Sequence, residues 1–93
     1  MVSDLEKISE YFVRIKDKKE MKIFLDGILT DAEREDIAKR IRIVEMLKEG
    51  VSQRKIVKAT GVGIATVTRG ARELKAGKFD TAVWRDFKSW RTS

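Results

Sequence analysis

Residues 52–78 read SQRKIVKATGVGIATVTRGARELKAGK, and this stretch decides the fold of the chain. Its pattern predicts one helix over residues 53–60, capped by Ser52, and a second over residues 64–76. The two are joined by the turn Gly61-Val62-Gly63, in which Gly61 stands where the chain needs a left-handed or crowded conformation. Two helices joined by a short turn that contains glycine form a helix-turn-helix unit, whose second helix lies in the major groove of DNA. The spacing alone fits an ordinary helical hairpin equally well. The unit is expected at about residues 52–76.

The distribution of charge separates these two interpretations. Residues 52–78 contain seven basic residues and one acidic residue, so they carry the whole net charge of +6 and leave the rest of the chain balanced. Attraction to phosphate needs cations gathered on one surface. The charge therefore favours DNA binding over a hairpin without this function. The seven basic residues are Arg54, Lys55, Lys58, Arg69, Arg72, Lys75 and Lys78.

The composition of the chain limits its other functions. At 93 residues it is expected to form one domain, residues 1–93, whose modest core would gain stability from a partner subunit. The sequence has no cysteine and no histidine, which removes the usual zinc ligands and the usual general base. We expect no catalytic residue, no metal site, no cofactor and no enzyme activity. Without a membrane-spanning apolar run or a signal peptide, a cytoplasmic protein with no membrane partner is expected.

Three more helices are predicted upstream of this unit, and no stretch alternates like a half-buried strand. The first opens with a capping box at residues 3–6 and is expected to end near residues 16–19. The second covers about residues 21–28. The third opens with a capping box at residues 30–33 and runs to Gly50, a natural C-terminal cap.

A sixth helix is predicted after Gly77, where apolar residues recur at helical spacing. Its aromatic residues are expected to be core or dimer contacts, not a binding patch. The apolar face consists of Phe79, Val83, Trp84, Phe87 and Trp90. The chain is therefore predicted to be all-α, with six helices and short loops.

The second helix of the helix-turn-helix unit presents three faces when its residues are placed 100° apart. The packing face consists of Val67, Gly70, Ala71 and Leu74. The DNA-facing side, small near its start and basic further on, consists of Ile64, Ala65, Thr68, Arg72 and Lys75. The third face, which points neither to the core nor squarely at DNA, consists of Thr66, Arg69 and Glu73. On the first helix, Ile56 and Val57 are expected to face inward.

The third helix contains an arginine within its apolar side. Ile37, Ile41, Val44 and Leu47 form the expected apolar arc, and Arg40 lies inside it. One interpretation is that its stem lies on the core and its head reaches water. The other is a pocket shared with Arg69, because two guanidinium planes can sandwich a flat ring and bind a carboxylate.

The residues that carry these features resemble the tryptophan repressor family of bacteria. The strongest match is Gly61-Val62-Gly63-Ile64-Ala65-Thr66-Val67-Thr68-Arg69-Gly70, which is similar to the turn and recognition helix of that family. Supporting matches are Leu29-Thr30, Glu33-Arg34-Glu35, Arg40-Ile41-Arg42-Ile43-Val44-Glu45 and Ser52-Gln53-Arg54. The resemblance covers roughly residues 29–75. It implies six helices per chain, two chains interleaved into a homodimer, and L-tryptophan or a close analogue as corepressor.

The resemblance also implies roles for individual residues. Arg40 and Arg69 would flank the indole ring, and Arg69 would hold the carboxylate. The other implied ligand-site residues are Gly27 and Leu29 through backbone carbonyls near them, Thr30, Gly70 and Glu73. On the operator DNA, Arg54 would reach a guanine, and the expected base contacts are Ile64, Ala65 and Thr68. The expected backbone contacts are Gln53, Thr66 and Lys75, with Arg72 on the same face as Lys75.

The sequence departs from the family pattern at several positions. Glu73 stands where the family has a serine that helps to bind the ligand ammonium, so this carboxylate could pair with the ammonium, point to solvent or mark a related ligand. The loop at residues 50–52 is one residue shorter than usual. The remaining departures are Val57 for lysine, Ala71 for serine and Arg72 for asparagine.

The sequence thus predicts a ligand-responsive, sequence-specific transcriptional repressor that acts as a homodimer on palindromic double-stranded DNA. The alternative is a ligand-independent DNA-binding or architectural module that has the fold and lacks the pocket. The sequence does not indicate the operator or the regulated genes.

Overall fold

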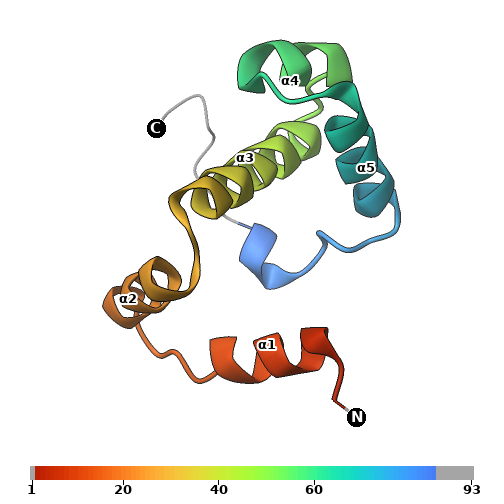
Figure 1. Ribbon diagram of the computed structural model, residues 1–93. Coiled ribbons are helices and arrows are strands. Elements are labelled where there is room, and N and C mark those ends of the chain that lie inside the picture. Colours follow the sequence, from red (N-terminus) through yellow and green to blue (C-terminus); the bar gives the residue numbers. More distant parts are fainter. Residues whose placement is uncertain (1, 86–93) are drawn as a thin grey trace. The chain divides into compact units, whose positions relative to one another are not determined.

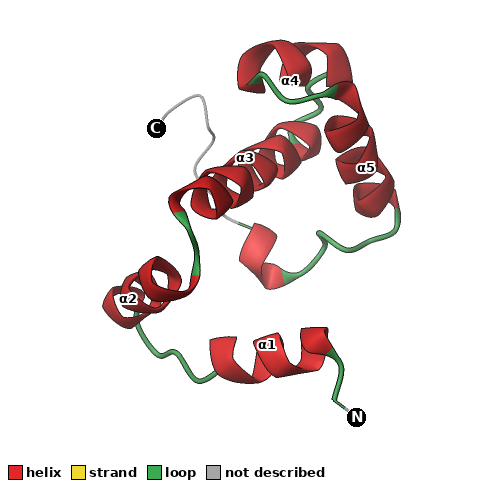
Figure 2. Ribbon diagram, in the orientation of Figure 1, coloured by secondary structure: helices red, strands yellow, loops and turns green. Residues whose placement is uncertain are grey.

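The protein is all-α in the part that the computed structural model describes, residues 2–85, as the sequence predicts. Five α-helices and one short 3-10 helix follow one another without a strand in these residues (Figures 1 and 2). Within this range no helix has the length and apolar character needed to cross a membrane. The elements are α1 (Asp4–Phe12), α2 (Lys18–Ile28), α3 (Asp31–Lys48), α4 (Gln53–Thr60), α5 (Ile64–Lys75) and η1 (Ala82–Trp84).

The N-terminal caps of three helices lie where the sequence predicts them. The Ser3 hydroxyl accepts a hydrogen bond from the Glu6 N–H at 3.1 Å and opens α1. At the start of α3, the Thr30 hydroxyl accepts from the Glu33 N–H, and the Glu33 carboxylate accepts from the Thr30 N–H. The Ser52 hydroxyl accepts from the Lys55 N–H at 3.3 Å and opens α4. These bonds satisfy backbone donors that have no partner within the first turn of a helix.

The predicted end of the first helix, near residues 16–19, is wrong. Helix α1 ends at Phe12, and the chain then continues through a turn to Asp17. The Asp17 side chain accepts from the Glu20 N–H at 2.8 Å and caps α2, with an extended backbone (φ −142°, ψ 168°) that interrupts helical geometry. The strong cap therefore starts the second helix earlier than predicted, at Lys18.

The chain divides into two compact units, and the first comprises residues 1–34. It contains α1, α2 and the start of α3. The rings of Phe12 and Phe24 meet edge to face at 5.3 Å, and Arg34 pairs with Asp26 and Asp31. No residue of α1 or α2 is buried. The large apolar side chains exposed on α1 and α2 are Leu5, Ile8, Tyr11, Phe12, Ile23 and Ile28.

The second unit, residues 35–93, holds the core. Ile43 and Met46 of α3 meet Ile56 of α4 and Val67 of α5, and each is at most 2% exposed. The inward orientation predicted for Ile56 and Val67 is confirmed. Side chains packed around this cluster are Leu47, Val51, Val57 and Val62.

The apolar arc predicted for α3 is only partly correct. Val44 is buried and Leu47 packs on the core, but Ile37 and Ile41 are 39% and 44% exposed. Helices α4 and α5 lie against the C-terminal half of α3 (Figure 1), so within this unit only the later residues of that helix are covered. Ile43 and Met46, which the arc omits, are two of the three buried residues of α3.

Two glycines shape the helix-turn-helix unit. Gly61 has φ +74°, the left-handed conformation that the sequence predicts, and its N–H donates to the Val57 carbonyl to close α4. Gly70 lets α5 approach α3, because a Cβ at this position would lie 3.2 Å from Cδ1 of Leu47. The turn and the close helix contact together fix the direction of α5.

The helix predicted after Gly77 is not an α-helix in the residues that the structure describes. After Gly77 (φ +82°) the chain forms a turn and then the 3-10 helix η1, Ala82–Trp84. Phe87 and Trp90, which belong to the predicted apolar face, lie outside the described residues.

Candidate functional site

The outer face of α5 is free of packing contacts with the core. All five residues of the predicted DNA-facing side are exposed, and their side chains run from uncharged at the start of the helix to basic at its end. Arg54 on α4 is also exposed, and Gln53 is partly buried. The exposed residues of α5 are Ile64, Ala65, Thr68, Arg72 and Lys75.

A side-chain hydrogen bond joins the two helices on this face. The Thr68 hydroxyl donates to Oε1 of Gln53 at 3.0 Å. This bond uses the carbonyl oxygen of the Gln53 amide, so its NH₂ group keeps two donors for another acceptor. The start of α4 is thereby held to the middle of α5, and polar groups from both helices lie side by side.

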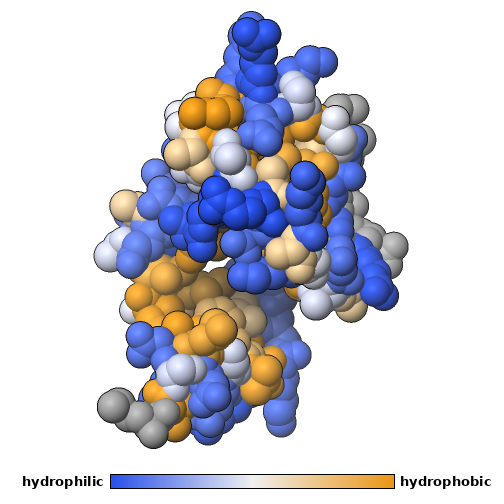
Figure 3. Space-filling view, turned by 90° about the vertical axis from the view of Figure 1, so that its right-hand side faces the viewer, coloured by the Kyte–Doolittle hydropathy of each residue, from blue (hydrophilic) through white to orange (hydrophobic). Residues whose placement is uncertain are grey.

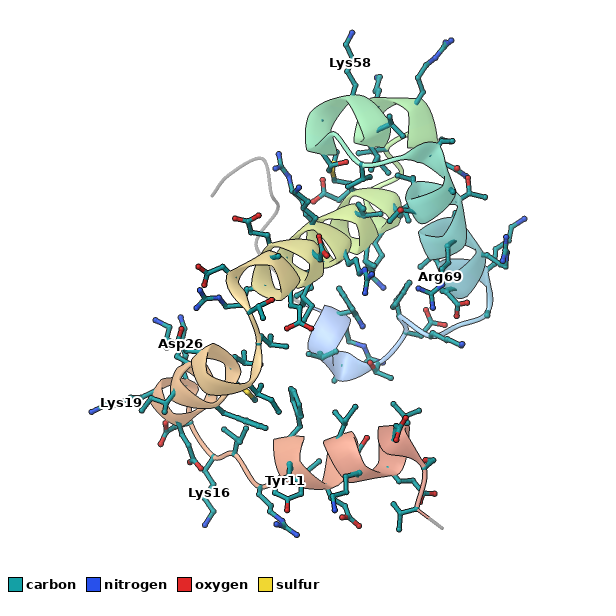
Figure 4. The ribbon with its side chains drawn as sticks, viewed as in Figure 1. Tyr11, Lys16, Lys19, Asp26, Lys58 and Arg69 are labelled. Atoms are coloured by element: carbon teal, nitrogen blue, oxygen red, sulfur yellow. The ribbon has the colours of Figure 1, made fainter. Side chains whose placement is uncertain are left out.

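Hydrophilic side chains dominate the surface around this unit. The upper part of Figure 3, at the height of α4 and α5 in Figure 1, is covered largely by hydrophilic residues. Lys58 extends away from α4 into solvent (Figure 4). Exposed cations of α4 and α5 can attract phosphate, and they include Arg54, Lys55, Lys58, Arg72 and Lys75.

A cavity of about 420 Å³ lies between α3, α5 and the segment that follows α5. Its volume is within the range of small-molecule sites, about 300–1,000 Å³. Helix α3 contributes Ile37, Arg40, Ile41, Ile43 and Val44. Helix α5 contributes Thr66, Arg69, Gly70 and Glu73, and the following segment contributes Lys78, Phe79 and Trp84.

Two arginines and an apolar wall set the chemistry of this cavity. Arg40 and Arg69 line it from different helices, and Arg69 lies on α5 near the segment that follows (Figure 4). The exposed Ile37 and Ile41 line the same space, which explains why α3 carries apolar residues that the core does not cover. Guanidinium groups beside an apolar wall suit a flat ligand with a carboxylate.

The acidic residue of α5 is paired within the cavity lining. Oε2 of Glu73 lies 2.7 Å from Nζ of Lys78, and the Glu73 side chain is 23% exposed. The hydrogen bond from Lys78 lowers the pKa of Glu73 from its ordinary value; burial opposes this shift, and the charges of Lys78, Arg69 and Arg72 add to it. Glu73 is therefore an anion at neutral pH.

The segment that follows α5 is held in place by several contacts. Nζ of Lys48 donates to the Phe79 carbonyl at 2.8 Å, which ties the segment to α3. The rings of Phe79 and Trp84 meet edge to face at 5.1 Å. Sequence reasoning missed Lys78, Phe79 and Trp84 as cavity residues, since it assigned Lys78 to the basic stretch and the two aromatics to a helix.

The remaining predicted site residues lie at different places. Thr66 lines the cavity, although the resemblance places it at the DNA backbone, and Gly70 both lines the cavity and packs on Leu47. Gly27, Leu29 and Thr30 belong to the first unit, where the Thr30 hydroxyl caps α3. Among residues 2–85 no group of three or more acidic side chains is arranged to hold a metal ion. The roles of all these residues stay predictions.

Comparisons with known proteins identify related repressors. The family profile described as Trp repressor protein matches residues 3–86. A Trp operon repressor homolog of Vibrio campbellii is 42% identical over 79 residues, which cover 84% of this chain and 78% of the relative. A homolog of the same description from Vibrio parahaemolyticus is 40% identical over 74 residues, 78% of this chain and 72% of the relative. No solved structure gives a significant match.

The Glu73–Lys78 pair predicts a pH-dependent stability. A lowered pKa of Glu73 in the folded state stabilises the protein above the ordinary value of 4.5, and this stabilisation is lost as the pH falls through the folded-state value. Lys78→Met should therefore lower the thermal midpoint at neutral pH, and the variant and wild type should converge at acid pH, once Glu73 is protonated in the folded protein as well. Lys75→Met, at an exposed position of α5, is the matched control and should change little at either pH. A loss of stability from Lys78→Met that is independent of pH would contradict the assignment.

Proposed function

The chain belongs to the Trp repressor family, a family of transcriptional repressors, and on this premise we propose that it binds operator DNA when L-tryptophan or a close analogue occupies its cavity. The observation that carries the proposal is the division of α5 into two working faces. Ile64, Ala65 and Thr68 are exposed on one face, and Thr66, Arg69 and Glu73 line the cavity. One rigid helix thus serves both DNA and ligand.

The lining of the cavity supports an aromatic amino acid as the ligand. The indole ring of tryptophan would lie against Ile37 and Ile41 between the guanidinium groups of Arg40 and Arg69. Arg69 would bind the carboxylate through two parallel hydrogen bonds. The volume of about 420 Å³ is sufficient for one amino acid of this size.

The switch is a change in population between orientations of the helix-turn-helix unit. A ligand that binds one orientation better shifts the protein toward it, and the affinity for DNA changes by the same coupling free energy. Since α5 forms one wall of the cavity, an occupant bears directly on the helix that carries the exposed face. No covalent chemistry is required.

The DNA contacts follow from the side chains on the exposed face. The small side chains of Ala65 and Thr68 allow α5 to approach base edges, and Arg54 can bind a guanine through two hydrogen bonds. Lys75, at the end of α5, is suited to phosphate. The two donors left on Gln53 are suited to a phosphate oxygen.

The first unit supports a dimer. Its helices bury no residue, yet they expose Leu5 (75%), Ile8 (52%) and Ile23 (67%), and hydrophobic side chains gather on the lower part of Figure 3. Exposed apolar surface of this kind marks an interface with another chain. In a homodimer two helix-turn-helix units face two half-sites, so the operator would be palindromic.

Ligand binding is tested by calorimetry with L-tryptophan. Arg69→Ala should weaken binding by about tenfold or more, because it removes charged hydrogen bonds to the carboxylate. Arg54→Ala, an equal truncation on the DNA face outside the cavity, should leave ligand affinity unchanged. If the wild type shows no binding at millimolar tryptophan, the corepressor proposal fails and the ligand-independent alternative takes its place.

DNA recognition is tested by competition among duplexes that differ at single base pairs. Arg54→Ala should relax the preference at one base pair, at a cost of about 1–3 kcal/mol. Lys75→Ala should weaken binding to all sequences alike and reduce the slope of affinity against salt by about one ion. Equal losses on every duplex from both variants would argue against sequence-specific readout.

The oligomeric state is tested by sedimentation of the full chain. We expect a dimer that persists when the protein is diluted into the micromolar range, because stable specific interfaces commonly dissociate only at lower concentrations. Replacing exposed Leu5 and Ile23 with glutamate should shift the population toward monomer or unfolded chain. Ile64→Glu is the control, because Ile64 is exposed at 55% on the DNA-facing side of α5 and lies outside the first unit, so this change should leave the dimer intact. A stable folded wild-type monomer would exclude the dimer.

A further inference from the structure

The Thr68 hydroxyl forms its hydrogen bond across the helix-turn-helix unit instead of along its own helix. A threonine in a helix can donate its hydroxyl hydrogen to the carbonyl of the residue four positions earlier. Here the hydroxyl donates to Oε1 of Gln53 at 3.0 Å, from the middle of α5 to the start of α4. Within residues 2–85 neither side chain makes a further hydrogen bond. The one hydrogen of the hydroxyl is therefore already used in the free protein.

This bond decides what the Thr68 hydroxyl can offer to a further partner. A hydroxyl group has one hydrogen to donate and two lone pairs that accept. Since Gln53 takes the hydrogen, the exposed Thr68 oxygen meets any partner in the major groove as an acceptor alone. The NH₂ group of Gln53 keeps both of its donors. The pair thus presents an acceptor from α5 beside donors from α4.

Base edges in the major groove differ in the group that they offer to such an acceptor. Adenine carries an amino group at N6 and cytosine carries one at N4, and both groups donate, whereas guanine O6 and thymine O4 accept. An oxygen with no hydrogen to donate gains a bond from an amino group and meets a second acceptor at a keto group. The bond to Gln53 therefore favours adenine or cytosine over guanine or thymine at the base beside Thr68.

We propose that Thr68 and Gln53 form one reading unit, in which Gln53 fixes the Thr68 hydroxyl as an acceptor that selects adenine or cytosine in the major groove. The inference rests on the proposed function, because it takes the exposed face of α5 to lie against base edges. Gln53 then sets a base preference without touching a base, in addition to its proposed contact with phosphate. It is a positioning residue for Thr68.

The test is a DNA competition assay with the full chain and L-tryptophan. A duplex selected from a random library is the reference, and it is compared with its single base-pair variants. Thr68→Val removes the hydroxyl and keeps a methyl group, so it should abolish a preference of about three- to tenfold for adenine or cytosine at one position. Thr68→Ser keeps the hydroxyl and should keep the preference. Thr81→Val is the matched control, since Thr81 is exposed and its side chain makes no capping hydrogen bond.

Gln53→Leu tests the positioning role. It frees the Thr68 hydrogen, which can then donate to guanine O6 or thymine O4, so the position affected by Thr68→Val should lose its preference in this variant too. A contact of Gln53 with phosphate alone predicts an equal loss on every duplex. Replacing the selected adenine with purine, or the selected cytosine with 2-pyrimidinone, removes only the amino group. This change should weaken the wild type by about three- to tenfold and Thr68→Val by less than about twofold.

Three results would overturn the inference. An unchanged preference in Thr68→Val would show that the hydroxyl does not read the base. A selected guanine or thymine at the position that this variant affects would show that the hydroxyl donates. An equal loss on every duplex in Gln53→Leu would leave Gln53 with a contact to phosphate alone. If the wild type still discriminates among duplexes, any of these results removes this inference only. If the wild type binds every duplex equally, the proposed DNA recognition fails with it.

Discussion

The packing of α5 against α3 is the contact on which the rest of the structure depends. Val67 is fully buried, and Gly70 lets the two helices come so close that a Cβ in its place would lie 3.2 Å from the Leu47 side chain. This contact occupies one side of α5 and leaves the other sides for partners. The exposed face and the cavity face are both positioned by the same few core atoms, so neither can move without the other.

That constraint gives the proposed switch a simple physical form. The cavity has one wall from α3, one from α5 and one from the segment tied to α3 by Lys48. A ligand between these walls acts on the position of α5, and the Thr68–Gln53 hydrogen bond connects α5 to the start of α4. Coupling between ligand and DNA then needs only a difference in affinity for two orientations of this unit. In the proposed switch, the coupling passes through the contacts of the ligand with α5 and of α5 with α4.

The elements with local signals could be predicted from the sequence. The bounds of α4, the caps Ser3, Thr30 and Ser52, and the left-handed Gly61 depend on neighbours within a few positions, and the structure places them as predicted. The end of α1 was not predicted because a cap at Asp17 outweighs the apolar spacing that continues past it.

Properties that depend on distant parts of the chain could not be predicted. Helical spacing does not say which stretch of α3 is covered, so Ile43 and Met46 were omitted and Ile37 and Ile41 were assigned to the core. The third face of α5, formed by Thr66, Arg69 and Glu73, predicts a ligand or another part of the protein beside it, but not which residues complete the cavity. Lys78 and Trp84 enter the same cavity through a turn that starts at Gly77, and no periodicity carries that information.

The central claim, that ligand and DNA act through one helix, is tested most directly by DNA affinity measured with and without ligand. Duplexes selected from a random library in the presence of L-tryptophan would be labelled and titrated with the protein, followed by fluorescence anisotropy. The account predicts a palindromic site bound about five- to 150-fold more tightly at saturating tryptophan, the usual range of coupling between two sites. Equal affinity for that site with and without tryptophan would contradict it.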